Sequence, residues 1–159
     1  MLRGSLWDDV KKRFFSAFIE EQERKLAEPR EPSLAYLAAS LVEYFRFLQS
    51  RPSFARLTCW MRLEGDDSCV EMDKKVVQLA TERVKLGQKA GYIRSDLRPE
   101  NVVITLLALV ENWFVSRHHY LQAHYADETF DEKGPDECYL NDVVKIFLEG
   151  IKGPNGEVP

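Results

Sequence analysis

The sequence is poor in the residues that staple small proteins together. Its three cysteines, Cys59, Cys69 and Cys138, are odd in number and widely spaced, so no disulfide framework or CxxC metal motif emerges. Reduced thiols of this kind are typical of cytoplasmic proteins. The longest nearly apolar run, residues 102–110, is far shorter than the roughly 20 residues that span a bilayer. Asp8 and Asp9 also argue against a secretory signal. We therefore expect a cytoplasmic protein.

Motifs of catalysis and of metal or cofactor binding are also missing. The chain has no GxGxxG, GxxxxGK[ST] or GxSxG sequence. All its histidines, His118, His119 and His124, lie in "RHHYLQAH", without the four-residue step of a zinc pair on a helix. The acidic run at 127–132 lacks the spacing of a calcium loop. We expect no enzyme activity, no metal and no cofactor.

An excess of positive charge is absent as well. The net charge is −4 and the pI is about 5.5, whereas a protein that grips nucleic acid needs clustered Lys and Arg. We therefore expect that this chain alone does not bind DNA specifically. Its 159 residues, 45% of them hydrophobic, suit a single domain with a sizeable core.

The sequence contains apolar residues at helical spacing in about six segments. The helices are expected at residues 6–27, 34–48, 52–64, 69–90, 99–123 and 137–151. Pro29 and Pro32 end the first, Ser33 is a plausible N-cap of the second, and Pro52 and Pro99 suit first turns. Leu6, Val10, Phe14, Ala17 and Phe18 share one face of the first helix, with Lys11 and Lys12 mostly elsewhere. We predict one all-α domain over 1–151 and a disordered tail over 152–159.

The helix that begins at Pro99 is apolar on two neighbouring faces. An amphipathic surface helix needs a single apolar stripe, so this helix is expected to be buried from more than one side. The final helix also carries a second apolar strip. One chain has too few helices to cover both, and we expect a homodimer with a four-helix bundle built on these two helices. The expected interface residues are Val102, Leu106, Leu109, Tyr139, Val143 and Ile146.

One stretch, "GQKAGYIRSDLRPENV", resembles a segment of a known family. The C-terminal regulatory domain of TetR-type transcriptional regulators has a helix that ends in "G…AG.IR.DLDP". Its counterparts here are Gly87, Ala90, Gly91, Ile93, Arg94, Asp96, Leu97 and Pro99. "RPSFARL" at 51–57 is similar to the short helix of that family, and "FLEGI" at 147–151 to the end of its final helix. The resemblance covers roughly residues 5–151.

The resemblance implies an effector-binding and dimerisation domain of a regulator, expected to be a repressor. Residues 5–27 would be the connecting helix, and the Gly91 stretch a hinge between the pocket helices and a rigid dimer core. The helix-turn-helix of this family lies upstream and is absent from this sequence, so contact with DNA is expected only through such a headpiece. The alternative is a stand-alone all-α dimer that binds a small molecule or a protein without touching DNA.

The resemblance also places an effector pocket between the helices that start near Ser33, Pro52, Cys69 and Pro99. Aromatic side chains with a few polar groups suit a small, largely hydrophobic or aromatic molecule. The expected walls are Tyr36, Phe45, Trp60, Met61 and Trp113, and the expected polar handles are Glu64, Asn112 and Arg117. Two alternatives stay open: the tryptophans are ordinary core residues, and Glu64 and Arg117 pair with each other.

Overall fold

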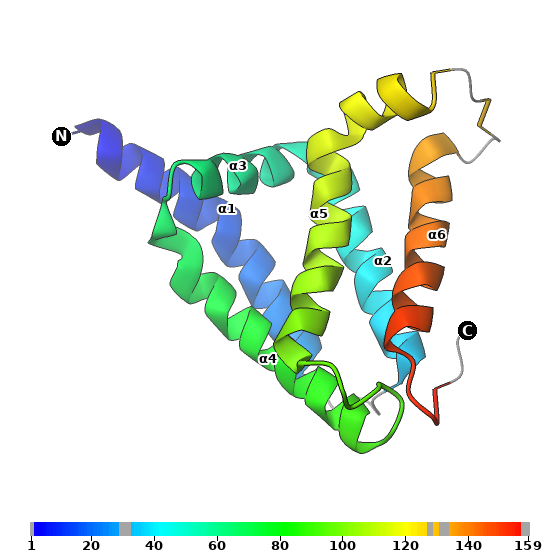
Figure 1. The fold of residues 1–159 in the computed structure, drawn as a ribbon. Coiled ribbons are helices and arrows are strands. Elements are labelled where there is room, and N and C mark those ends of the chain that lie inside the picture. Colours follow the sequence, from blue (N-terminus) through cyan, green and yellow to red (C-terminus); the bar gives the residue numbers. More distant parts are fainter. Residues whose placement is uncertain (1, 29–32, 127–128, 131–133, 157–159) are drawn as a thin grey trace.

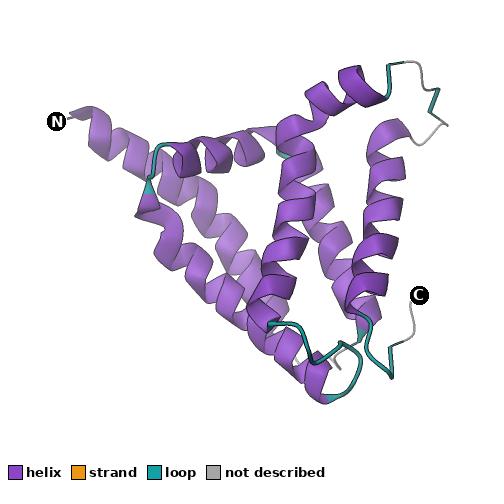
Figure 2. Ribbon diagram, in the orientation of Figure 1, coloured by secondary structure: helices purple, strands orange, loops and turns teal. Residues whose placement is uncertain are grey.

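Helices make up nearly all the regular structure of the computed structural model (Figures 1 and 2), which describes residues 2–28, 33–126, 129–130 and 134–156. These residues contain no β-strand, only one antiparallel bridge between Ile93 and Lys152. A short 3-10 helix at Asp67–Cys69 accompanies six α-helices. The α-helices are α1 (Leu2–Ala27), α2 (Leu34–Ser50), α3 (Pro52–Leu63), α4 (Val70–Lys89), α5 (Pro99–His124) and α6 (Gly134–Ile151). The predicted all-α class is confirmed.

Local signals explain most helix boundaries. The Ser33 hydroxyl accepts a hydrogen bond from the Tyr36 amide at 3.1 Å, which caps α2. Pro52 and Pro99 open α3 and α5, as predicted. The last helix starts at Gly134, three residues before the predicted Glu137, and Pro135 occupies its first turn. The expected loop at Pro29 and Pro32 and most of the acidic loop lie outside the described residues. No helix in the described part is long and apolar enough to cross a bilayer.

The central element is α5, which contacts α2, α3, α4 and α6. In Figure 1 it runs through the middle of the molecule, with α1 and α4 side by side on one flank and α2 beside α6 on the other. Val102, Val103, Val110 and Trp113 of α5 are buried. This burial on several sides agrees with the two apolar faces in the sequence.

Hydrogen bonds close the corner between α4 and α5. Gly91 has φ +80, and the Tyr92 amide donates to the Gly87 carbonyl at 3.0 Å, while the Gly91 amide donates to Gln88 at 3.0 Å. This pattern is a Schellman motif, in which glycine adopts a left-handed backbone at low cost. The Gln88 side chain donates to the carbonyls of Arg94 and Leu97 at 3.0 and 2.7 Å. The stretch singled out in the sequence is therefore a helix stop with its polar groups paired.

The end of the chain packs on this corner. The amides of Gly153 and Asn155 donate to the carbonyls of Tyr92 and Gly91, both at 2.9 Å, and the Arg94 amide donates to Ile151 at 2.9 Å. Residues 152–156 are thus ordered where the sequence predicts a disordered tail, because the corner offers them backbone partners. Residues 157–159 lie outside the described residues.

The buried residues of the connecting helix include positions that the sequence did not select. Phe15 and Ile19 are buried, and Phe18 is partly buried. Lys11, predicted to lie away from the apolar face, is only 4% exposed. The side chains of Leu6, Val10, Phe14 and Ala17 lie outside the described part of the chain.

A polar cluster accounts for the burial of Lys11. Its ammonium donates to Asp66 Oδ2 at 2.6 Å and to Ser68 Oγ at 2.9 Å, which ties α1 to the loop before α4. Asp66 Oδ1 also accepts from the Ser68 amide at 3.0 Å. Hydrogen bonds from Lys11 and Ser68 lower the pKa of the Asp66 carboxyl from 3.8 to about 2.

We predict that Asp66→Asn lowers the melting temperature by several degrees at neutral pH, because it removes the negative charge of the carboxylate that accepts a hydrogen bond from the buried Lys11 ammonium. The folded-state pKa of Asp66 is depressed, so its stabilisation is complete above about pH 4 and disappears as the pH falls through about 2. Circular-dichroism melts across this range test both statements. The exposed neighbour substitution Asp67→Asn is the control, and equal melting temperatures for both variants at pH 7 would contradict the prediction.

Candidate functional site

A cavity of about 420 Å³ lies between α1, α2, α3, α4 and α5. Its lining is mainly apolar, and each of the five helices contributes. The side chains that set its character include Phe15, Phe18, Leu37, Val77, Leu106 and Leu107. Cavities of this size and lining are typical of small-molecule sites.

Aromatic rings form one wall of the cavity. The Phe18 ring lies 6.0 Å from Tyr44 and 5.1 Å from Phe54, centroid to centroid, and Phe15 lies 5.0 Å from Phe54. Phe47 closes the cluster behind Phe18 at 4.4 Å. Four of these five rings come from α1 and α2, so the wall depends on how those two helices pack.

A carboxylate also lines the cavity, next to Tyr44 of this wall. Glu111 of α5 has a side chain only 13% exposed, and its Oε1 accepts a hydrogen bond from the Tyr44 hydroxyl at 2.7 Å. Arg62 of α3 forms an ion pair with the same carboxylate, with Nη2 3.3 Å from Oε1. The sequence analysis did not select Glu111. The signal was present, since this is the one acidic residue between Val102 and Arg117 of an apolar helix.

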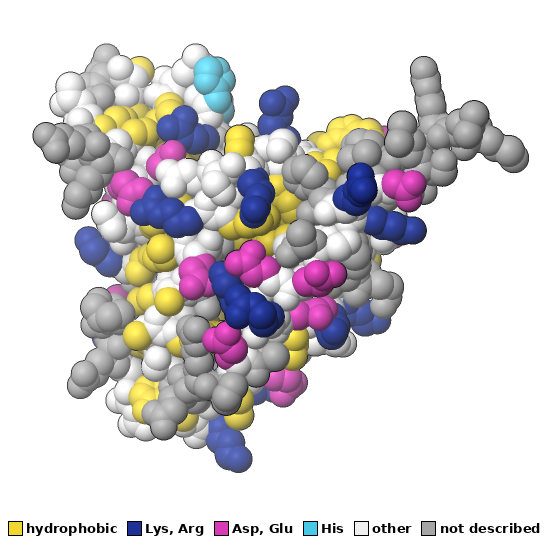
Figure 3. All heavy atoms as spheres, turned by 180° about the vertical axis from the view of Figure 1, so that it is seen from behind, with side chains coloured by type: hydrophobic (Ala, Val, Ile, Leu, Met, Phe, Trp, Pro, Cys, Tyr) yellow, Lys and Arg dark blue, Asp and Glu magenta, His cyan; other side chains and the backbone are white. Residues whose placement is uncertain are grey.

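Charged side chains gather at the rim, over the middle of the face seen in Figure 3. Lys25 of α1 bridges to Glu43 of α2 and to Glu21 on its own helix, each at 3.2 Å. Burial lowers the pKa of Lys25, but the hydrogen bonds from Lys25 to Glu21 and Glu43 outweigh it, and the net shift is upward. The Arg83 guanidinium lies over the Tyr36 ring at 5.7 Å. One ion pair, Lys25–Glu43, therefore joins α1 to α2 at the rim.

Most residues predicted to bind an effector lie away from this cavity. Tyr36 lines it. Phe45 is fully buried beside Phe114, whose ring centroid is 4.7 Å away. Trp60 and Met61 on α3, Glu64 just after it, and Asn112 on α5 also lie outside the lining. Of these, Met61 is buried, Trp60 and Glu64 are exposed, and Asn112 is exposed and donates to the Tyr120 hydroxyl at 2.9 Å.

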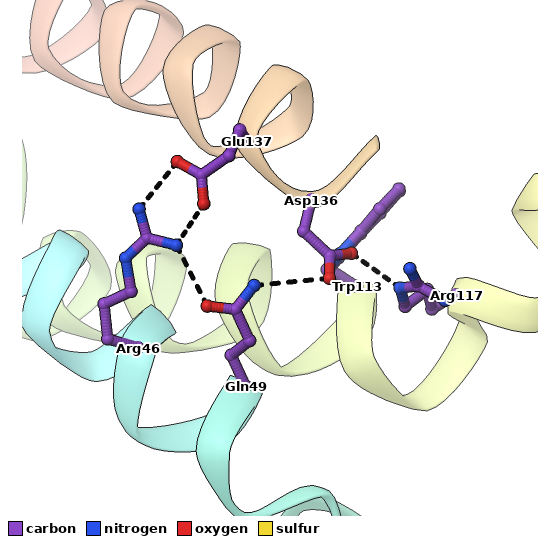
Figure 4. A network of polar contacts seen from close by, with 6 residues as sticks. All are labelled: Arg46, Gln49, Trp113, Arg117, Asp136 and Glu137. Carbon is purple, nitrogen blue, oxygen red and sulfur yellow. Dashed lines mark hydrogen bonds and ion pairs between the residues drawn. The ribbon is translucent and has the colours of Figure 1, made fainter. Parts of the chain in front are cut away.

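Trp113 and Arg117 instead belong to a polar network at the other end of α5 (Figure 4). The Trp113 ring is 2% exposed, and its Nε1 donates to Asp136 Oδ1 at 3.0 Å. Arg117 Nε donates to the same oxygen at 2.6 Å, and Gln49 Nε2 reaches Oδ2 at 3.3 Å. Trp113 is therefore buried among core residues in this structure, and Arg117 pairs with Asp136 rather than with Glu64.

This network fixes the start of α6 against α2 and α5. Burial raises the pKa of the Asp136 carboxyl, but the hydrogen bonds from Arg117 and Trp113 outweigh it and hold the pKa below its ordinary value. Arg46 of α2 pairs with Glu137, the next residue of α6 (Figure 4). Gln49 lies between the two carboxylates and accepts from Arg46 at 2.9 Å.

The expected interface residues are divided between the interior and the surface. Val102 and Leu106 line the cavity. Val143 is buried in the core of its own chain, and the Tyr139 hydroxyl donates to the Leu109 carbonyl at 2.7 Å. Ile146 is 67% exposed, on the outer surface of α6. The outer apolar residues of α5 are Ile104 and Val115, 56% and 45% exposed. Apolar periodicity locates both stripes but does not tell which of them the chain itself covers.

Comparison with protein families identifies the family of this chain. The model of the tetracyclin repressor-like, C-terminal domain family matches residues 37–134. The chain belongs to this family. The predicted resemblance is thereby confirmed. No match is found among curated proteins or among solved structures. The match to the tetracyclin repressor-like domain runs from α2 to the first residue of α6, so it includes the α2–α5 walls of the cavity.

We predict that Trp113→Phe lowers the free energy of unfolding by about 1–3 kcal/mol, because it keeps a ring beside Tyr139 but removes the N–H that donates to Asp136 and part of the buried ring volume. Urea denaturation measures the loss. Since Trp113 does not line the cavity, any ligand of the cavity should stabilise this variant as much as the wild type. An unchanged unfolding free energy would contradict the role assigned to the indole N–H.

Proposed function

We propose that this chain is the effector-binding and dimerisation domain of a tetracyclin repressor-like transcriptional regulator that acts as a repressor. The observation that carries the proposal is the apolar cavity of about 420 Å³ within a domain of this family. The volume lies within the range of small-ligand pockets. The proposed effector is a small, largely hydrophobic molecule, since most of the lining is apolar.

The cavity also offers a route for a signal. Its walls include both α1 and α4, and the Lys25–Glu43 ion pair joins α1 to α2 at the rim. An effector shifts an equilibrium only through different contacts in the two states. A molecule that packs against Phe15 and Phe18 contacts α1 directly, so its binding favours one angle of this helix. We propose that α1 carries that angle to a DNA-binding headpiece.

The outer surface of α5 and α6 is proposed to form a homodimer. Ile104, Val115 and Ile146 are large apolar side chains that the chain itself leaves exposed. Exposed apolar residues on adjacent helices suit the centre of a symmetric interface. The two helices from each chain would form a four-helix bundle.

We predict that Leu106→Trp abolishes effector binding while the domain stays folded, because the indole occupies cavity volume. A thermal-shift screen of hydrophobic molecules identifies compounds that stabilise the wild type. At a ligand concentration of about 100 times Kd, binding raises the free energy of unfolding by roughly 2.7 kcal/mol. The matched control is Leu63→Trp, at a position on α3 that is 80% exposed. A compound that stabilises the wild type and Leu106→Trp equally would place the effector site outside the cavity.

We also predict that Ile146→Arg converts a dimer into a folded monomer, because it buries a guanidinium in the interface without a partner. Size-exclusion chromatography with light scattering at micromolar concentration measures the mass. Val70→Arg, on an exposed apolar residue of α4, should leave the dimer intact. A wild-type chain that is a monodisperse monomer under these conditions would refute the proposed dimer.

A further inference from the structure

We infer that the effector is a hydrophobic amine, whose protonated nitrogen pairs with Glu111 while its apolar body fills the cavity. The inference rests on the proposed effector site and adds the charge of the ligand. Three observations support it. Glu111 is the least exposed acidic side chain of the cavity lining, its partner Arg62 is exposed, and aromatic rings line the same cavity.

Glu111 differs from the other carboxylates of the cavity. Its side chain is 13% exposed, against 38% for Glu28 and 52% for Glu43. A carboxylate removed from water needs a cation or strong hydrogen-bond donors, because burial of an unpaired charge is costly. The Tyr44 hydroxyl supplies one donor and fixes the direction of the carboxylate. The cavity wall therefore contains a carboxyl group whose oxygens bind a tyrosine hydroxyl and a guanidinium.

The cation that faces Glu111 is far more exposed to solvent than the carboxylate. Arg62 reaches the carboxylate from α3 with its own side chain 61% exposed. Water solvates so exposed a guanidinium once it leaves the carboxylate, so the cost of displacing Arg62 falls mainly on Glu111, which then needs another cation. A ligand ammonium enters the same position from inside the cavity, and Arg62 then swings into solvent. The exchange keeps Glu111 paired and couples ligand binding to the loss of one contact between α3 and α5.

The aromatic wall favours the same charge. Phe18, Tyr44 and Phe54 line the same cavity as Glu111, and ring faces attract cations. The same rings provide flat apolar surface for the rest of the molecule. A carboxylate with adjacent rings thus matches both parts of a hydrophobic amine.

An anionic ligand fits less well. At the rim, Arg24 pairs with Glu28 and Lys25 with Glu43, while Arg83 lies over the Tyr36 ring. Arg24 is 65% exposed, so it offers a solvated charge rather than a buried site. A ligand carboxylate inside the cavity would instead face Glu111, and like charges at short range repel.

Three probes that share one aromatic body separate these possibilities: naphthylethylamine, naphthylethanol and naphthylpropionate. They carry a cation, a neutral hydroxyl and an anion at neutral pH. Isothermal titration calorimetry of the wild-type chain should show the amine binding at least about tenfold more tightly than the alcohol, and the propionate binding most weakly.

Two substitutions then assign the preference to Glu111. Glu111→Gln should weaken amine binding about tenfold or more and change alcohol binding less than about threefold. Arg62→Gln should strengthen amine binding, because it removes the competing cation. Arg46→Gln is the matched control, since Arg46 forms a comparable ion pair with Glu137 outside the cavity. Circular-dichroism melts check that each variant is folded.

The outcomes separate this inference from the proposed function. If the alcohol or the propionate binds as tightly as the amine, and Leu106→Trp abolishes that binding, the effector site stands and the amine inference fails. An amine advantage that persists in Glu111→Gln also overturns the inference. If no probe binds the wild type, the inference fails, and the effector screen with Leu106→Trp remains the separate test of the site. Binding that Leu106→Trp leaves intact contradicts the proposed site itself.

Discussion

The burial of α5 is the constraint on which the rest of the structure depends. This helix is apolar on more than one side, so α2, α3, α4 and α6 all pack against it. The covering differs along its length. Its C-terminal half carries the large rings of Trp113 and Phe114, which fill the space toward α2 and α6. Its N-terminal half carries Val and Leu side chains, which leave the cavity between α5 and the helices α1–α4. Side-chain volume along one helix thus separates a packed end from a hollow one.

The helices were predictable from the sequence because their signals are local. Ser33, Pro52, Gly91 and Pro99 act within one turn of their own positions, so their neighbours in the sequence are enough to interpret them. The apolar repeats between them place the six helices, and the order of motifs around Gly91 indicates the family. The start of α6 was placed three residues late, since the Gly134–Pro135 pair suits both a loop and a first turn.

The cavity walls and the buried polar pairs were not predictable in the same way, because they depend on contacts distant in sequence. The burial of Lys11 depends on an ion pair with Asp66, which lies 55 residues later in the sequence. The burial of Trp113 depends on Asp136, a residue of another helix that accepts a hydrogen bond from the indole N–H. Tyr36, which lines the cavity, was predicted from a resemblance that locates the site between helices. The rotation of each helix about its axis decides which stripe faces the cavity, and periodicity alone does not determine it.

The hydrogen-bonded corner between α4 and α5 has a mechanical consequence. Residues 152–156 form backbone hydrogen bonds to it, and the Schellman motif adds hydrogen bonds within it, so the C-terminal end of α4 is fixed in place. The 20 residues of α4 extend about 30 Å from that point. A rotation of about 5° there carries the opposite end roughly 2.6 Å, while the residues beside the corner barely move. The loop that holds Lys11 lies at this opposite end, so such a rotation of α4 would displace the part of α1 that carries Lys11.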